Sequence, residues 1–229
     1  MKSKIAFSLI FLSVLVLSQN HRTVEINFTP KYKNHTIEIS DDKSDILDPE
    51  NGLEISQLKF YLSHFQLIKN NEIVFSEENS FHLLDATMKE TMDIKLSVPD
   101  HLIFDTVRFF IGIDKETNNN GISGGDLDPA KGMYWSWQTG YINVKIEGKS
   151  QLCNTRKNEF MYHLGGFLDD NYIYNSVDIL AENKNYITVN MSLDKILSEI
   201  NFSKKCQMMT PGTEAKELLN QFSKILILN

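Results

Sequence analysis

The sequence predicts an all-β fold: a single β-sandwich of short, mostly antiparallel strands with one or two helices near the C-terminus. Between residues 24 and 191, apolar and polar residues alternate in short runs separated by turn-forming Asn, Gly and Asp residues. A helical spacing of apolar residues appears only after residue 191. Short strands with turns at this spacing are typical of a sandwich, whereas a parallel sheet would need helices between its strands.

The strands can be placed in chain order. Residues 24–28 and 36–40 alternate with period two, as half-buried strands do. Residues 58–68 are apolar on both faces, which predicts a central strand, and Asn70-Asn71 predicts the turn that follows it. The other expected strands are 72–75, 80–84, 92–98, 106–113, 133–137, 141–148, 159–164 and 186–191.

Two helices are expected near the C-terminus. Residues 192–200 place their apolar side chains on one helix face (193, 196, 197 and 200), and Ser192 is a suitable N-cap. Residues 210–225 form the second expected helix, with Pro211 near its first turn.

The first 19 residues read as a secretory signal peptide. Lys2 and Lys4 form a positive start, and an apolar run of about a dozen residues ends at Leu17, which is short for a membrane span. We therefore expect residues 1–19 to be a signal peptide and residues 20–229 to be one domain. The sequence predicts a periplasmic or secreted protein with no membrane insertion after signal cleavage.

Charge and cysteine content restrict the possible partners. Without the first 19 residues the chain keeps 21 basic residues against 30 acidic ones, and no basic stripe occurs. An acidic protein is repelled by phosphate backbones, so we expect no nucleic-acid partner. Cys153 and Cys206 can pair in an oxidising compartment, or remain as two free thiols.

Both tryptophans lie in one strand, and this predicts a site. Trp135 and Trp137 have the same parity, so they share a face. The apolar parity switches before Ile142, which predicts a β-bulge at Thr139-Gly140. His163 lies in a second aromatic strand, and it meets the tryptophans if the two strands are neighbours. The alternative is packing: a Trp-x-Trp pair is more often part of a core or an aromatic ladder, and His163 can be a core histidine.

Residues 121–148 resemble the signature of MbnP-like domains, the methanobactin-partner family of exported copper-binding proteins. They read GISGGDLDPAKGMYWSWQTGYINVKIEG, and the form MYWSWQTGYIN is similar to the branch common in Bacteroidota. Four shorter motifs follow the family's order, so the resemblance covers nearly all of residues 20–229. These are FYLSHFQL at 60–67, FFIGID at 109–114, YHLGG at 162–166 and MMTPG at 208–212.

The resemblance implies an extracytoplasmic β-sandwich in which two histidines hold one copper ion. It also implies a tryptophan at the site that is oxidised to kynurenine by a partner di-haem enzyme of the cytochrome c peroxidase type. The tryptophan motif corresponds to Trp135 and Trp137, and one histidine to His163. The other histidine position is Ser63 here, and His64 stands where the family has Asp or Asn. Adjacent strand residues point to opposite faces, so His64 can replace a histidine at position 63 only through a bulge.

Two function classes stay open on these grounds. One is an exported copper carrier with His163, His64 and Ser63 as candidate metal residues. The other is a metal-free β-sandwich that binds a partner and has lost the copper site. The common motifs of hydrolases, P-loop proteins and dinucleotide-binding enzymes are absent from the sequence, so we expect no enzymatic activity. The loop from Asp114 to Asp128 is rich in oxygen ligands for calcium, but we favour a plain solvated loop shaped by Asn and Gly turns and keep calcium as a minor hypothesis.

Overall fold

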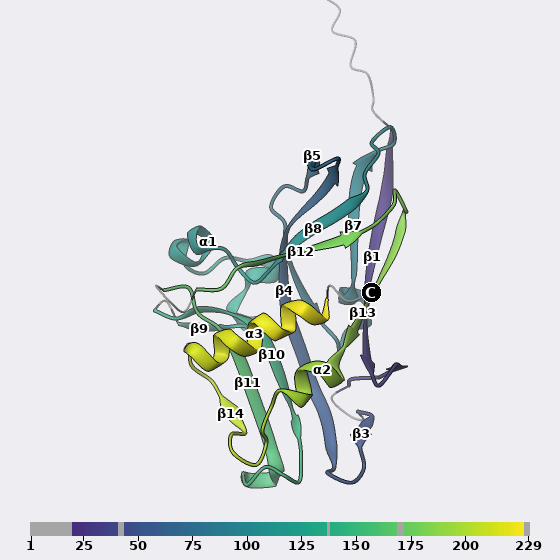
Figure 1. Ribbon diagram of the computed structural model, residues 1–229. Helices are drawn as coiled ribbons and strands as arrows, with labels where there is room; N and C mark the ends of the chain where they lie inside the picture. Colours follow the sequence, from purple (N-terminus) through teal and green to yellow (C-terminus); the bar gives the residue numbers. More distant parts are fainter. Residues whose placement is uncertain (1–19, 41–43, 137, 169–171, 227–229) are drawn as a thin grey trace, which may run out of the picture.

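The computed structural model describes residues 20–40, 44–136, 138–168 and 172–226, and within them the strands form two sheets (Figure 1). The smaller sheet has four strands: β13 (Tyr186–Ser192), β1 (His21–Tyr32), β2 (His35–Thr36) and β7 (Asp93–Pro99). The larger sheet has ten. Its main order is β12 (Asn175–Leu180), β8 (Thr106–Ile111), β4 (Leu53–Lys69), β10 (Gly140–Lys149), β11 (Glu159–Gly165) and β14 (Gln207–Met208). The strands β3 (Ile46–Asp48), β5 (Glu72–Ser76) and β6 (Phe81–Asp85) pair with β4, and β9 (Tyr134–Ser136) pairs with β10.

The main core lies between the two sheets and follows the alternation read from the sequence. Phe28 of β1, Phe60 of β4 and Phe109 of β8 are buried there, and the ring of Phe28 meets each of the other two edge to face. Most pairings are antiparallel, but β1 pairs with β13 in parallel and β11 with β14 in parallel. The fold is therefore the all-β sandwich that the sequence predicts, with β4 as the central strand between β8 and β10.

A second, smaller apolar cluster lies on the outer face of the larger sheet. It contains Tyr61 of β4 and Tyr141 of β10, whose rings meet edge to face at 5.8 Å, together with Met133 and Leu127 from the segment before β9. That segment turns back over the sheet through the hydrogen bond from Ile142 N to Met133 O (2.9 Å). The outer face is thus partly covered, which gives it buried positions for polar side chains.

The helices agree with the sequence at the C-terminus and differ from it in one place. The helices α2 (Leu193–Ser198) and α3 (Thr213–Ile225) pack against the main core, and α3 buries Leu219 and Phe222 there. A further helix, α1 (Lys115–Asn120), occupies the oxygen-rich stretch that was expected to be a plain loop. Asp114 explains it, because its side chain caps the helix by accepting from Thr117 N (2.8 Å). Short 3₁₀ turns occur at η1 (Lys89–Met92), η2 (Gly125–Leu127), η3 (Pro129–Lys131) and η4 (Arg156–Asn158).

Other local expectations have mixed outcomes. Cys153 and Cys206 form a disulfide with a Cα–Cα distance of 5.8 Å, which decides between the two alternatives. The predicted strand at 36–40 is wrong beyond Thr36, and β12 lies in a segment for which no strand was predicted. In the described ranges, no helix is both long and apolar enough to cross a membrane.

Candidate functional site

His163 lies on the outer face of the larger sheet, in a row of charged side chains. The register pairs His163 of β11 with Lys145 of β10, and Lys145 with Lys59 of β4. The neighbouring residues of these strands, such as Leu164 and Val144, belong to the main core. Since strand side chains alternate between faces, His163, Lys145 and Lys59 all point outward, toward the side of the second apolar cluster.

One nitrogen of the His163 imidazole forms a hydrogen bond, and the other has no hydrogen-bond partner. Its Nε2 lies 2.6 Å from Oε1 of Glu147. Because a carboxylate only accepts, Nε2 carries the hydrogen and donates it. Nδ1 is buried and has no hydrogen-bond partner, and the residue is only 6% exposed. A neutral His163 therefore presents an unused lone pair at Nδ1 inside the protein.

The charges around this histidine support the same assignment. The hydrogen bond from His163 lowers the pKa of Glu147, and the nearby Lys145 and Lys59 lower it further, so Glu147 is a carboxylate at neutral pH. Burial lowers the pKa of Lys145, whose ammonium donates to Gly132 O (2.7 Å). Lys59 pairs with Asp85 at 2.9 Å. Each charge in the row has an opposite charge or a carbonyl beside it, whereas Nδ1 of His163 has neither.

Trp135 lies on β9, which folds over the outer face. It packs against the second apolar cluster, is partly buried, and keeps its indole Nε1 buried without a hydrogen-bond partner. Trp137 lies outside the described residues. The predicted bulge is confirmed, because the register shifts between Gly140 and Tyr141 and Gly140 has a φ of +73°. At this position a Cβ would lie 2.2 Å from Oδ1 of Asn118, so only glycine fits.

Ser63 and His64 lie at a bulge in β4. Between Ser63 and Gln66, β4 advances three residues while β8 advances two, from Phe110 to Arg108. His64 has a φ of +53°, a left-handed conformation that is strained for a histidine. The bulge that would let His64 stand in for a histidine at position 63 is therefore present.

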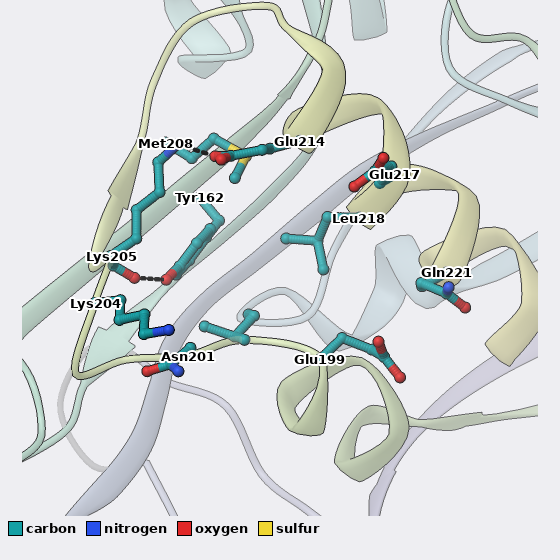
Figure 2. A pocket seen from close by; sticks show the side chains of 11 residues that line it. Tyr162, Glu199, Asn201, Lys204, Lys205, Met208, Glu214, Glu217, Leu218 and Gln221 are labelled. Atoms are coloured by element: carbon teal, nitrogen blue, oxygen red, sulfur yellow. Dashed lines mark hydrogen bonds and ion pairs between the residues drawn. The ribbon is translucent and has the colours of Figure 1, made fainter.

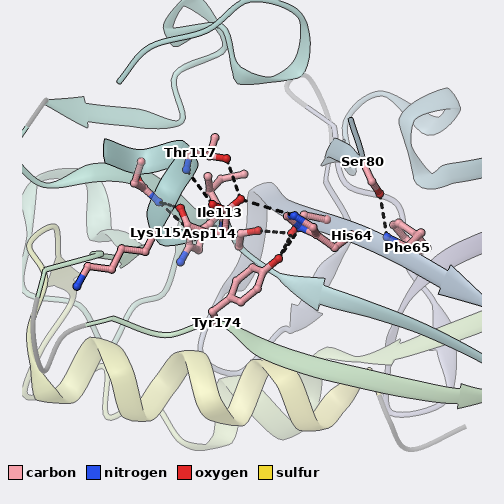
Figure 3. Close-up of polar contacts among 12 residues, drawn as sticks. His64, Phe65, Ser80, Ile113, Asp114, Lys115, Thr117 and Tyr174 are labelled. Atoms are coloured by element: carbon pink, nitrogen blue, oxygen red, sulfur yellow. Dashed lines mark hydrogen bonds and ion pairs between the residues drawn. The ribbon is translucent and has the colours of Figure 1, made fainter. Parts of the chain in front are cut away.

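The contacts made at this bulge are shown in Figure 3. Nδ1 of His64 lies 2.5 Å from the hydroxyl of Tyr174, and Nε2 lies 3.8 Å from Oδ2 of Asp114. The hydroxyl of Ser63 is fully buried; it donates to Gly112 O (2.8 Å) and lies 3.2 Å from the Tyr174 hydroxyl. Ser63 and His64 thus meet at one tyrosine, and their partners Gly112, Tyr174 and Asp114 come from the segments that follow β8 and precede β12.

His163 lies apart from the cluster formed by Ser63, His64 and Tyr174. Its row crosses β4 at Lys59, four residues before Ser63, and two strand spacings separate β11 from β4. Strand geometry puts the two positions about 16 Å apart, which is too far for one ion to contact both. The candidate residues therefore fall into two places, the His163–Glu147 pair and the cluster of Ser63, His64, Tyr174 and Asp114.

The oxygen-rich loop uses its carboxylates to fix its own backbone. Asp114 caps α1, and Asp128 accepts from Ala130 N (2.8 Å). Asp126 accepts from Leu83 N (3.1 Å) and pairs with Lys131. Among the residues that the structure describes, no three His, Cys, Asp or Glu side chains converge as a metal site. Calcium in this loop stays a prediction, because these contacts explain the carboxylates without it.

An open groove of about 420 Å³ lies between β14 and the two C-terminal helices (Figure 2). Tyr162, Met208 and Leu218 provide apolar surface, while glutamates and lysines stand at the rim. Lys205 pairs with Glu214, and the Tyr162 hydroxyl donates to the backbone oxygen of Lys205.

Comparison with known proteins identifies the family of this chain. The family model named MbnP matches residues 21–212. The chain belongs to the MbnP family. Among solved structures it is similar to MbnP from Methylosinus trichosporium, with 12% sequence identity, a TM-score of 0.54, and 80% of each chain covered. This likeness concerns the fold. No curated protein matches the chain.

Sequence reasoning missed Glu147 and Tyr174 as partners of the two histidines. Glu147 has a weak signal, because it lies on the polar parity of the strand 141–148. The bulge at His64 has a clearer signal in the sequence. Phe60 and Leu62 are even-numbered, Phe65 and Leu67 are odd-numbered, and all four belong to the main core, so the buried face switches parity between them. Tyr174 precedes β12, which the sequence did not predict, and no local pattern marks it.

Proposed function

We propose that this MbnP-family protein is exported and carries copper, bound through Nδ1 of His163. The observation that supports this most directly is the buried, unpartnered Nδ1 of a histidine whose other nitrogen is held by a carboxylate. Metal-binding histidines almost always donate their second N–H to a carboxylate or carbonyl, which fixes the tautomer and increases ligand basicity. Glu147 occupies that supporting position.

We propose a ligand set other than the two histidines that the family resemblance implies, and it leaves out Ser63 and His64. Ser63 donates its hydroxyl hydrogen to Gly112 O, and both residues lie about 16 Å from His163 by strand geometry. The strand itself supplies a soft side chain. Met161 lies two residues before His163 on the same face of β11 and is partly buried. A thioether suits Cu(I), so we propose His163 with Met161 as the copper-binding pair.

Trp135 fits the second part of the proposal, a tryptophan oxidised by a partner di-haem enzyme of the cytochrome c peroxidase type. Its indole is electron-rich, lies on the outer face beside the second apolar cluster, and has an Nε1 without a partner. Oxidation to kynurenine would cleave the C2–C3 bond of the indole and release its C2 carbon as formate, so the side chain gains one oxygen and loses one carbon. The change would appear in the intact mass of the peptide that holds Trp135 and Trp137.

Competition with a chromophoric Cu(I) chelator tests the copper proposal. We expect one Cu(I) per chain, a loss of at least about 100-fold in affinity for His163→Ala, and about 10- to 100-fold for Glu147→Gln, because supporting groups typically contribute that much. His82→Gln is the matched control, since His82 also pairs with a carboxylate on this sheet (Glu77, 2.8 Å). Unchanged binding in His163→Ala contradicts the assignment. No Cu(I) binding by the native chain favours the metal-free interaction module.

A further inference from the structure

We propose that His64 and Asp114 form a second metal site, open to solvent, that binds a divalent transition-metal ion through Nε2 of His64 and the carboxylate of Asp114. This site is separate from His163 and does not depend on the copper proposal. It follows from the number of hydrogens available in the cluster shown in Figure 3.

Three contacts within hydrogen-bond criteria join four groups in a line: His64 Nδ1 to Tyr174 (2.5 Å), Tyr174 to Ser63 (3.2 Å, the longest), and Ser63 to Gly112 O (2.8 Å). Each hydrogen bond needs one hydrogen, and the two hydroxyls supply only two. The carbonyl of Gly112 cannot donate. The third hydrogen is therefore on Nδ1 of His64, and the chain of donors runs from His64 to Tyr174, then to Ser63, and ends at Gly112.

The opposite direction leaves a contact without a hydrogen. If Tyr174 donated to Nδ1, its oxygen could not also donate to Ser63, and the Ser63 hydrogen is already needed at Gly112. Ser63 is fully buried, so water cannot compensate for a lost bond there.

Fixing the hydrogen on Nδ1 leaves the lone pair of a neutral His64 on Nε2. That atom lies on the side of Asp114; the side chain of His64 is 43% exposed and that of Asp114 is 19% exposed, so solvent reaches the pair. This is the arrangement in which an inner hydrogen bond from one imidazole nitrogen orients the other for a metal. Tyr174 has the role that a carboxylate has in most such sites.

The spacing of the two ligand atoms fits one ion between them. Nε2 of His64 and Oδ2 of Asp114 are 3.8 Å apart, which is too long for a direct hydrogen bond. A zinc-like ion lies about 2.0 to 2.2 Å from each such ligand, so an ion that contacts both spans up to about 4.2 Å. Water completes the coordination from the open side. An imidazole with a carboxylate suits a divalent ion such as Zn(II), rather than Cu(I).

The surrounding groups hold both ligands in place. The ring of His64 meets Phe81, Phe110 and Tyr174 edge to face, with ring centroids 5.4 to 6.1 Å apart. Phe110 and Tyr174 stack at 4.5 Å. Asp114 is fixed by Thr117, whose backbone N–H and hydroxyl donate to its two oxygens at 2.8 Å each. Neither ligand needs to change rotamer when an ion enters.

Titration of the protein with Zn(II) alone, followed by calorimetry, tests the site. We expect one Zn(II) per chain and a loss of at least about tenfold in affinity for His64→Gln and for Asp114→Asn. Asparagine also caps helices, so Asp114→Asn removes the charge while α1 stays capped. His82→Gln is the matched control and should bind as the native chain does, because its Nε2 already lies 2.8 Å from Glu77. Equal affinity in the native chain and in Asp114→Asn overturns the proposal.

Nitrogen-15 NMR of the histidine rings tests the hydrogen count without a variant that perturbs the fold. The metal-free protein should show His64 with its hydrogen on Nδ1, and Zn(II) should shift Nε2. Tyr174→Phe should weaken this tautomer and lower Zn(II) affinity by about tenfold. A metal-free His64 with its hydrogen on Nε2 contradicts the proposal. His163→Ala should leave Zn(II) binding unchanged, so failure here and failure of the copper proposal give different results.

Discussion

His163 and His64 lie on one sheet, yet they present opposite nitrogens in opposite environments. His163 gives Nε2 to Glu147 and keeps Nδ1 buried without a partner. His64 gives Nδ1 to Tyr174 and turns Nε2 toward solvent and Asp114. The same side chain is therefore suited to a buried soft ion in one place and to an exposed divalent ion in the other. The neighbour that takes the first nitrogen decides which nitrogen is left for a metal.

The backbone contributes to the difference as well. His163 occupies a regular strand position with an ordinary partner in register, Lys145. His64 occupies a bulge with a positive φ, and its hydrogen-bonded chain ends on the carbonyl of Gly112, which also has a positive φ (+96°). We therefore expect the stability of the region around His64 to depend on local backbone geometry. We expect the stability of the region around His163 to depend on charge. Four predictions test this contrast.

Gly112→Ala should have the largest effect. A Cβ at this position would lie 2.5 Å from Cγ of Asn143, and the φ of +96° disfavours any side chain. We expect a loss of about 3 kcal/mol in the free energy of unfolding, measured by chemical denaturation. Gly124→Ala is the control, because nothing lies within 4 Å of its Cβ. Similar losses in both variants would show that Gly112 has no special role.

Ser63→Ala should have the next effect. It removes the only hydroxyl between Tyr174 and Gly112, and leaves a buried carbonyl and a phenol hydrogen without this partner. We expect a loss of about 2 kcal/mol in the free energy of unfolding. Ser198→Ala loses only an exposed bond to Lys195 O and should change stability by less than about 0.5 kcal/mol. An equally small change for Ser63 would mean that water or another group satisfies Gly112.

Glu147→Gln should lower the free energy of unfolding at neutral pH and flatten its dependence on pH in acid. The folded-state pKa of Glu147 lies below its unfolded value, mainly because of the hydrogen bond from His163. Its contribution is therefore present above a pH of about 4.3, the ordinary glutamate pKa, and is lost as the pH falls through the lowered value. We expect denaturation curves of the variant to lose about 1 kcal/mol of this acid dependence. Glu54→Gln, at the exposed pair with Lys149, should leave the profile nearly unchanged.

Replacing each histidine with asparagine compares the two positions directly, and His64→Asn should have the smallest effect on stability of all these variants. Asparagine tolerates the left-handed conformation, and His64 is half-exposed, so His64→Asn should change the free energy of unfolding by less than about 0.5 kcal/mol. His163→Asn shortens a buried side chain away from Glu147 and should cost about 1 to 2 kcal/mol. A larger loss in the free energy of unfolding for His64→Asn than for His163→Asn would contradict this prediction. It would show that the side chain at the bulge contributes more to stability.

The sequence by itself determined the repeating local features of this protein. Alternation along the strands gave the all-β class and the central position of residues 58–68, since one face of each strand must be apolar where two sheets pack. The parity switch after Trp137 gave the bulge at Gly140, because only a shift in register returns Ile142 to a buried face.

Only the tertiary structure decided which groups surround each histidine. Glu147 reaches His163 because β10 and β11 pair in one register, and Tyr174 reaches His64 across 110 residues because β12 joins the edge of the same sheet. A shift of one residue in either pairing would turn these side chains to the opposite face. Local sequence sets what each strand can present, and the register between distant strands sets which nitrogen is free, since hydrogen bonds form only between groups that the fold brings within about 3 Å.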